Sequence, residues 1–87
     1  MMITKRNGLV CLFDDEKVTR SILKACGDTE HETVSPAVAE AMANEVFARL
    51  TARHEVITTA EVRACVYALL REKELPETAR CYMEFNK

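Results

Sequence analysis

Residues 3–18 read ITKRNGLVCLFDDEKV, and they hold the signals for a hairpin that runs directly into a helix. At their centre is Asn7-Gly8, a dipeptide that tolerates the positive φ values of a two-residue type I′ hairpin loop. The flanking residues are β-prone, so we expect strands over residues 2–6 and 9–13 to pair across this loop. The acids that follow suit the positive end of a helix dipole, which predicts that a helix begins there.

The first helix is expected over residues 15–26. Asp14 is its predicted N-cap, and Gly27 is expected to end it. At 100° per residue, three cations fall within about 60° of one another on this helix, opposite its apolar side. This cationic strip consists of Lys17, Arg20 and Lys24.

The hairpin adds two cations to those of the strip. Because no linker separates Phe13 from Asp14, the hairpin must pack near the start of the first helix, and Lys5 and Arg6 can then converge with Lys17 on one anion. A cationic strip alone is more often an ordinary solvated helix face than an anion site. Five cations so close in sequence, in a chain whose net charge is −2, favour a local anion site instead.

A loop and a second helix come next. Residues 28–34 carry three acids without periodicity, which is typical of a loop. Ser35 is the predicted cap and Pro36 the first residue of a helix over residues 36–53. Its expected buried stripe recurs at four-residue intervals and consists of Val38, Met42, Val46 and Leu50.

The remaining chain predicts one strand and two helices. Residues 55–58 are rich in β-branched side chains, which favours a third strand that joins the hairpin. Thr58 and Glu61 match a capping box for a helix over residues 59–73, which a Leu-Pro pair then ends. A last helix is expected over residues 77–86, and most of its four apolar side chains Ala79, Tyr82, Met83 and Phe85 are expected to reach the core.

Composition limits the fold and the partners. With 87 residues, 48% of them apolar and 30% charged, the chain is long enough for one domain over residues 1–87 that buries roughly 60–65% of its unfolded surface. We expect an α+β fold, mainly α, in which a small three-stranded sheet caps a bundle of four helices. The charge of −2 disfavours nucleic acid and anionic membranes as partners. No segment has the pattern of a signal peptide or a membrane span, so the expected location is the cytoplasm.

The cysteines agree with that compartment. The four cysteines form no C-x-x-C pair, and the two histidines do not supply H-x-x-x-H, so no zinc or thioredoxin spacing is present. We expect four reduced thiols that act as small apolar side chains, without a bound metal.

The order of these motifs resembles the ATP-cone domain family. The family's opening hairpin is similar to Ile3-Thr4-Lys5-Arg6-Asn7-Gly8. The end of its second strand and the start of its first helix match Phe13-Asp14, Lys17-Val18 and Arg20. Three later segments are similar to its second, third and fourth helices, namely residues 35–39, 57–62 and 78–82.

The resemblance implies a function. ATP cones occur at the N-terminus of ribonucleotide reductase large subunits and in the repressor of ribonucleotide reductase genes. They are not enzymes, but bind ATP or dATP and change activity or oligomeric state. The implied ligand is therefore ATP or dATP, with or without Mg²⁺. The implied partners are a ribonucleotide reductase subunit, another regulated protein or a second copy of the chain.

The resemblance also implies which residues hold phosphates. Carried over by position, Lys5 and Arg6 would do so from the hairpin and Lys17 from the first helix. Arg63 would stand near the phosphates from the third helix, and Lys87 is a further candidate contact. The chain has no G-x-x-x-x-G-K-[ST] motif, so side chains rather than a backbone loop must hold the phosphates.

Three further residues are implied for the rest of the nucleotide. Ile3 would pack near the base, and Asp14 and Thr59 would contact base or ribose. We find no catalytic base or pair of Mg²⁺-holding carboxylates beside the cations, and therefore expect binding without hydrolysis.

Two other functions compete with this one. The first is an interaction domain of the same shape that no longer binds nucleotide and contacts a protein, through the acidic residues 28–34 for example. The second is a small helical DNA-binding regulator, which the net charge and the lack of a helix-turn-helix signature disfavour.

Overall fold

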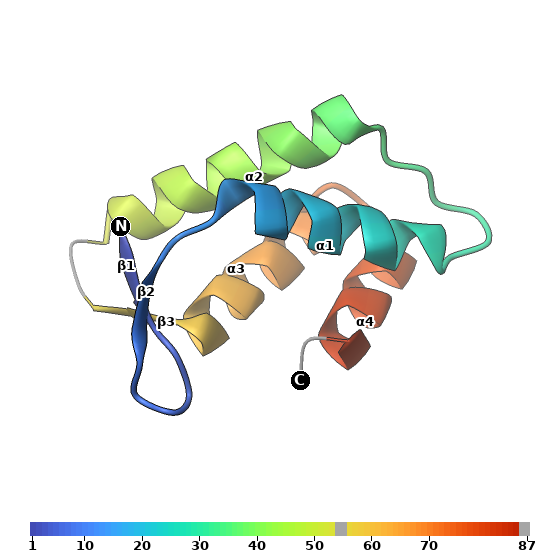
Figure 1. Cartoon of the computed structure of the whole chain (residues 1–87). Coiled ribbons are helices and arrows are strands. Elements are labelled where there is room, and N and C mark those ends of the chain that lie inside the picture. Colours follow the sequence, from blue (N-terminus) through green and yellow to red (C-terminus); the bar gives the residue numbers. More distant parts are fainter. Residues whose placement is uncertain (54–55, 86–87) are drawn as a thin grey trace.

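Four helices and a small sheet make up the computed structural model, which describes residues 1–53 and 56–85 (Figure 1). The strands are β1 (Met2–Thr4), β2 (Val10–Leu12) and β3 (Ile57–Thr58). The helices are α1 (Asp15–Gly27), α2 (Pro36–Thr51), α3 (Thr59–Glu72) and α4 (Pro76–Phe85). This is the α+β, mainly helical architecture that the sequence predicts, and the prediction of fold class is confirmed.

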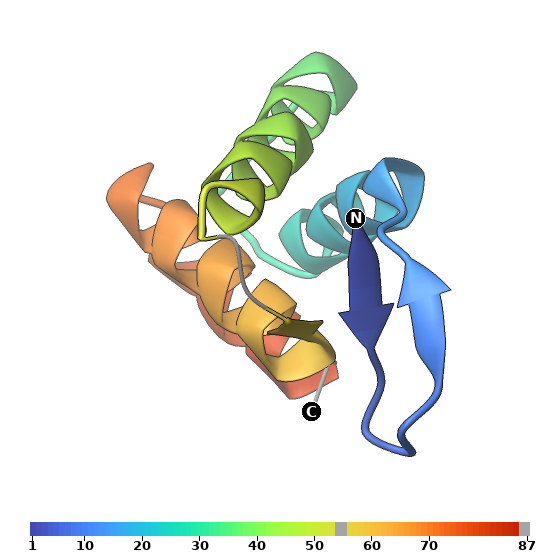
Figure 2. The ribbon, with the colours of Figure 1, turned by 90° about the vertical axis from the view of Figure 1, so that its left-hand side faces the viewer.

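The sheet has the order β2-β1-β3 and mixes two kinds of pairing. β1 and β2 are antiparallel, with Ile3 opposite Cys11. β1 and β3 are parallel, with Ile3 opposite Ile57 and Thr4 opposite Thr58. The third strand is shorter than the expected 55–58, and residue 55 lies outside the described residues. Figure 2 shows β1 between its two neighbours, at one end of the bundle.

The hairpin turn differs from the expected two-residue type I′ loop. The Gly8 N–H donates to the Lys5 carbonyl (2.9 Å), and the Lys5 N–H donates to the Leu9 carbonyl (2.7 Å). Gly8 has φ +86°, whereas Asn7 is not in the positive-φ region that a type I′ loop needs at both positions. Asn7 instead accepts the Leu9 N–H with its side chain (3.1 Å). The loop therefore has three residues and ends in a left-handed glycine, and the strands are shorter than the expected 2–6 and 9–13.

A short joint fixes the hairpin to α1. The Asp14 side chain accepts the Lys17 N–H (3.2 Å), as its predicted role of N-cap requires. Just before it, the Phe13 ring lies 5.5 Å from that of Phe47 on α2. At the other end α1 includes Gly27, which has no positive φ, so glycine does not end this helix as expected.

The four helices close a ring around one core. α1 packs against α2 and α4, and α3 packs against the same two helices. The core takes residues from every helix and from the inner side of the sheet, and its most completely buried large members are Ile22, Leu50, Ile57, Leu69, Leu70, Val46 and Val66.

The buried stripe of α2 departs from the expected one at its first member. Met42, Val46 and Leu50 are buried, but Val38 is 49% exposed. Four-residue steps advance 400°, so they drift by about 40° each and turn Val38 about 120° away from Leu50. Ala39, at 0% exposure, takes the buried place instead.

The N-terminus of α4 is capped by a residue distant in sequence. Leu75, which precedes the helix, has no side-chain oxygen to act as a cap. The Glu32 carboxylate takes its place, because it accepts the N–H of Glu77 (2.9 Å) and both the N–H (2.7 Å) and the hydroxyl (2.6 Å) of Thr78. Glu32 of the acidic loop 28–34 therefore serves as the N-terminal cap of α4.

α3 ends in a left-handed residue that is not glycine. Glu74 has φ 61°, and its N–H donates to the Arg71 carbonyl (3.1 Å). The next N–H, of Leu75, donates to the Leu70 carbonyl (2.9 Å). These are the two hydrogen bonds of a Schellman motif, in which glycine is the usual left-handed residue.

The other element ends differ from expectation by one or two residues, as is common at fraying helix ends. The helix expected over 36–53 ends at Thr51, and that expected over 59–73 ends at Glu72. The last helix begins at Pro76, one residue early. The predicted capping box of α3 is confirmed, with Thr58 and Glu61 bonded in both directions. In the described part of the chain, no helix has the length and apolar content to cross a bilayer.

We expect Glu32→Gln to lower the free energy of unfolding at pH 7 by about 1–2 kcal/mol, because a charged cap with three donors is lost. Chemical denaturation would measure the change. Glu30→Gln is the matched control, since Glu30 is exposed in the same loop and touches only His31 there. Equal stability of the two variants would show that the cap contributes nothing.

The same cap predicts a pH dependence. Partial burial raises the pKa of the Glu32 carboxyl, but hydrogen bonds from Thr78 and Glu77 outweigh it and hold the pKa below its usual value. The stabilisation is thus present above about pH 4.3 and is lost as pH falls through the lowered pKa. Thermal unfolding between neutral and acidic pH should show a smaller loss for Glu32→Gln than for the wild type. Parallel curves would contradict this role.

Glu74→Gly should raise the free energy of unfolding by about 0.5 kcal/mol or more. A left-handed non-glycine residue costs roughly 1–2 kcal/mol, which exceeds the added entropy of glycine in the unfolded chain, about 0.4–1 kcal/mol. Glu74→Ala keeps the Cβ atom and should leave stability within about 0.5 kcal/mol. A glycine variant no more stable than the alanine variant would argue against strain at this position.

Candidate functional site

The parallel pairing of β1 and β3 brings Lys5 and Thr59 together. Thr4 lies opposite Thr58 in this pair, so the next residue of each strand leaves the sheet at the same end. The hairpin tip, the first turn of α3 and the last turn of α4 all lie low in both Figure 1 and Figure 2.

The face of α3 continues from Thr59 to Arg63, since residues four apart on a helix are neighbours. Both are half-buried. Burial raises the pKa of the Tyr82 phenol to about 12, and the nearby positive charge of Arg63 opposes that rise. Arg63 therefore lies close to α4 as well as to the start of α3.

The cationic strip of α1 faces the end of α4. Lys24 Nζ lies 5.1 Å from the centroid of the Phe85 ring, in cation–π contact. Lys17 is seven residues earlier and so lies within about 20° of Lys24 around the helix, with Arg20 beside them. Phe85 is 57% exposed and follows the buried Tyr82 by three residues. The expectation that most of the apolar side chains of this helix reach the core is wrong, because Ala79 and Tyr82 are buried but Met83 and Phe85 are 37% and 57% exposed.

These contacts close a ring of segments around one side of the molecule. It passes from the hairpin tip to α3, from α3 to α4, from α4 to α1, and back to the hairpin through the Asp14 joint. We call this the cone face, and define it by Lys5, Arg6, Lys17, Arg20, Lys24, Thr59, Arg63 and Phe85.

The described cations outside the cone face are mostly paired with carboxylates, whereas those of the cone face are not. Elsewhere, three arginines are neutralised by carboxylates, as Arg49 binds Glu72 (2.7 Å) and Glu45 (3.1 Å), Arg53 binds Glu61 (3.4 Å) and Arg80 binds Glu84 (3.2 Å). Within residues 1–53 and 56–85, none of the six cations of the cone face has an ion-pair partner. Arg71 and Lys73 at the far end of α3 have no ion-pair partner there either, but six of these eight unpaired cations of the described residues belong to the cone face. Most of the unneutralised positive charge of an acidic chain therefore lies on that face, as an anion site requires.

The remaining expected site residues, Asp14, Ile3 and Lys87, are less well placed to contact a nucleotide than the cations. Asp14 lies at the joint between hairpin and α1, where one carboxylate oxygen already caps the helix. Ile3 is only 4% exposed, so it can support the floor of a site but offers little surface of its own. Lys87 lies outside the described residues.

Three members of the cone face were not among the residues predicted from sequence to touch the nucleotide. Arg20 and Lys24 were recognised only as part of the cationic strip, and Phe85 was counted among the apolar side chains of the last helix, most of which were expected to reach the core. The helical spacing of Tyr82 and Phe85 was visible in the sequence. Nothing in it placed the end of α4 against α1.

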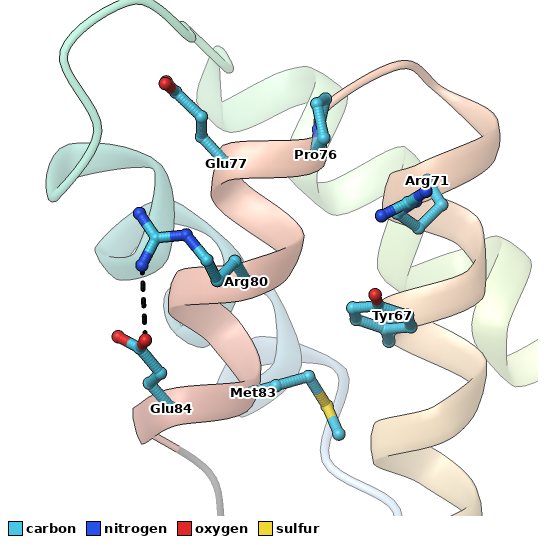
Figure 3. A pocket seen from close by; sticks show the side chains of 7 residues that line it. All are labelled: Tyr67, Arg71, Pro76, Glu77, Arg80, Met83 and Glu84. Carbon is cyan, nitrogen blue, oxygen red and sulfur yellow. Dashed lines mark hydrogen bonds and ion pairs between the residues drawn. The ribbon is translucent and has the colours of Figure 1, made fainter.

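Two hollows lie away from the cone face and suit a polyanion less well. One, of about 590 Å³, lies between the outer sides of α3 and α4 (Figure 3), where Arg71 lies over Tyr67 at 6.0 Å and two arginines are balanced by two glutamates. The other, of about 710 Å³, lies between the sheet and the end of α2 and has no charged side chain in its lining. Neither collects positive charge.

Comparison with known proteins agrees with this geometry. The family model of the ATP cone domain matches residues 1–87. The chain belongs to this family. As an ATP cone, it has the hairpin, the three-stranded sheet and the four helices in the order described above.

A curated relative gives a second comparison. The transcriptional repressor NrdR of Picosynechococcus sp. (strain ATCC 27264 / PCC 7002 / PR-6) is 38% identical to this ATP cone over 72 residues. The match covers 82% of this chain but 38% of that protein, so the chain spans well under half the length of this relative.

Proposed function

We propose that this ATP cone is a non-catalytic regulatory module that binds ATP or dATP at the cone face. The observation that carries the proposal is the gathering of six unpaired cations from three separate segments on one side of an acidic chain. Membership of the ATP cone family supports an adenine nucleotide as the anion.

The phosphates are held by side chains in this proposal. Lys5 and Arg6 reach them from the hairpin tip, Lys17 from α1 and Arg63 from α3. Each charge-assisted contact contributes roughly 1.5–3 kcal/mol, so three or four of them reach micromolar affinity after the cost of association. Both backbone groups of Lys5 are hydrogen-bonded within the hairpin, so its side chain projects from a fixed main chain.

The base and ribose occupy the remaining part of the cone face. Phe85 offers an exposed ring for contact with the base, and Thr59 and Asp14 offer oxygens for base or ribose. Ile3 supports this region from the core side. We include Lys87 as a further phosphate contact from the residues that follow α4.

Binding at this face suits control of a partner, because one ligand would tie together the hairpin, α1, α3 and α4. We propose a ribonucleotide reductase subunit, another regulated protein or a second copy of the chain as that partner. The relative named a transcriptional repressor favours gene control as one output. We do not assign nucleic-acid binding to the cone itself, since its unpaired cations are committed to the nucleotide.

Three further assignments follow from the same reasoning. Residues 1–87 form one domain, which the family match over that range supports. The cone works in the cytoplasm, where its four free cysteines stay reduced. Any Mg²⁺ binds through the triphosphate rather than to the protein alone, because the described residues bring together no group of three or more potential metal ligands.

The alternative is an interaction domain that does not bind nucleotide. The acidic loop is a weaker contact surface than the sequence suggested, since Glu32 is engaged by α4. The loop also lies at the opposite end of the molecule from the hairpin (Figure 1), so the two functions can be tested separately.

Isothermal titration with ATP and with dATP, each with and without Mg²⁺, tests the proposal. Lys5→Ala with Arg6→Ala should weaken binding by about 2 kcal/mol or more, roughly 30-fold, because two charge-assisted contacts to one polyanion are lost. Thermal unfolding without nucleotide should stay within about 0.5 kcal/mol of wild type, since both side chains are exposed.

Arg71→Ala with Lys73→Ala is the matched control, because it removes the same charge from exposed positions at the far end of α3. That end lies about 20 Å from the first turn of the helix, beyond the Debye length at physiological salt. The control should bind nearly as wild type does. If the wild type gains no thermal stability from millimolar nucleotide, or if both double variants lose affinity alike, the interaction domain becomes the better account.

A further inference from the structure

The outer edge of the sheet is open. β2 pairs only with β1, and it forms the outermost element on that side in Figure 2. Its residues are Val10, Cys11 and Leu12, with neither the lysine nor the proline that commonly protects an edge strand. Val10 is 56% exposed and Leu12 is 70% exposed.

The backbone of this edge offers two donors and two acceptors. Lys5 bonds Leu9 and Phe13 bonds Met1 across the hairpin (2.7 and 2.8 Å). Antiparallel ladders alternate, so Cys11 also turns its backbone groups inward, whereas Val10 and Leu12 turn theirs outward. No turn or cap hydrogen bond among the described residues uses these outward groups.

This pattern is complementary to itself. When a second β2 lies antiparallel with Cys11 opposite Cys11, Val10 of each copy faces Leu12 of the other. Each such pair exchanges an N–H and a C=O in both directions. All four outward groups of each copy are then satisfied, and a two-fold axis passes between the cysteines.

The charges beside the edge favour the same antiparallel register. Arg6 stands five residues before Cys11, and Glu16 stands five residues after it. The exposed cationic tip of one copy therefore approaches the exposed acidic start of α1 in the other, where Asp15 adds a second carboxylate. A parallel pairing would instead set like charges side by side.

The exposed apolar surface beside β2 limits the size of the proposed interface. A large apolar side chain contributes roughly 100 Å² when fully exposed. Met2, Leu9, Val10 and Leu12 are each more than half exposed, so with the edge backbone they supply roughly 300–500 Å² per copy. A dimer then buries roughly 600–1,000 Å², which is the size of a weak, transient interface.

We infer that two copies of this chain associate reversibly through their β2 edges, antiparallel and centred on Cys11, to join their sheets into one. We expect a Kd between about 10 μM and about 1 mM, in keeping with a small, transient interface. The association needs no nucleotide, and its strand pairing does not use the cone face, although Arg6 lies beside both surfaces.

Sedimentation velocity of the reduced, nucleotide-free protein over that concentration range is the first test. The wild type should shift from monomer to dimer. Leu12→Lys should raise the Kd at least about tenfold, because a lysine on an edge strand opposes pairing. Val38→Lys makes the same exchange at an exposed position on α2 and should dimerise as the wild type does.

Cysteine cross-linking tests the register. In a directly opposed pair without hydrogen bonds the Cα atoms lie about 4.5 Å apart, within the range that a disulfide spans. Copper phenanthroline as oxidant should take two electrons from two Cys11 thiolates and join them, with the protons released to solvent. Peptide mass spectrometry should find Cys11 linked to Cys11, and Cys11→Ser should abolish the link while still dimerising.

Several outcomes would overturn the inference. These are a wild type that stays monomeric up to about 1 mM, a Leu12→Lys variant that dimerises equally well, or a cross-link through Cys65 rather than Cys11. Loss of nucleotide binding alone would leave the inference intact, because these measurements contain no nucleotide.

Discussion

The arrangement of this molecule depends on the two-residue joint between β2 and α1. Asp14 caps the helix by accepting the Lys17 N–H, and Phe13 packs against Phe47 of α2. With no linker between them, the hairpin cannot swing away from the bundle without loss of the cap and of the aromatic contact. The cations of the hairpin tip and of α1 are therefore held on one side, and parallel pairing of β1 with β3 adds the start of α3 to the same side.

The distribution of ion pairs explains why that side is suited to an anion. The arginines that link α2 to α3 or lie on the outside of α4 have carboxylate partners, whereas the described cations of the cone face do not. Unpaired cations repel one another and weaken the fold slightly, so their grouping is better explained by a ligand than by stability. A ligand that bridges three chain segments can also change their relative positions, which is how the proposed regulatory module would act on a partner.

Local sequence signals predicted the elements well, because caps, a turn dipeptide and apolar spacing act over a few residues. The capping box at Thr58 and the cap at Asp14 are confirmed in this way. Two features that the sequence did not place depend on contacts between distant residues. The cap of α4 comes from Glu32, 45 residues before Glu77, and the Phe85 ring meets Lys24 on another helix. Val38 was misplaced because a four-residue interval does not match the 3.6-residue turn.

The proposal requires the hairpin tip, α1 and α3 to hold one polyphosphate together. Backbone ¹H–¹⁵N NMR of the labelled chain during a titration with ATP tests it most directly, because each amide reports on its own surroundings. We expect saturable shifts at Lys5 to Gly8, Lys17, Thr59 and Arg63, with the same midpoint for all of them. The amides of the loop 28–34 and of Arg71 to Glu74 should not move. Shifts confined to one segment, or spread evenly over all exposed cations, would contradict a site assembled at the cone face.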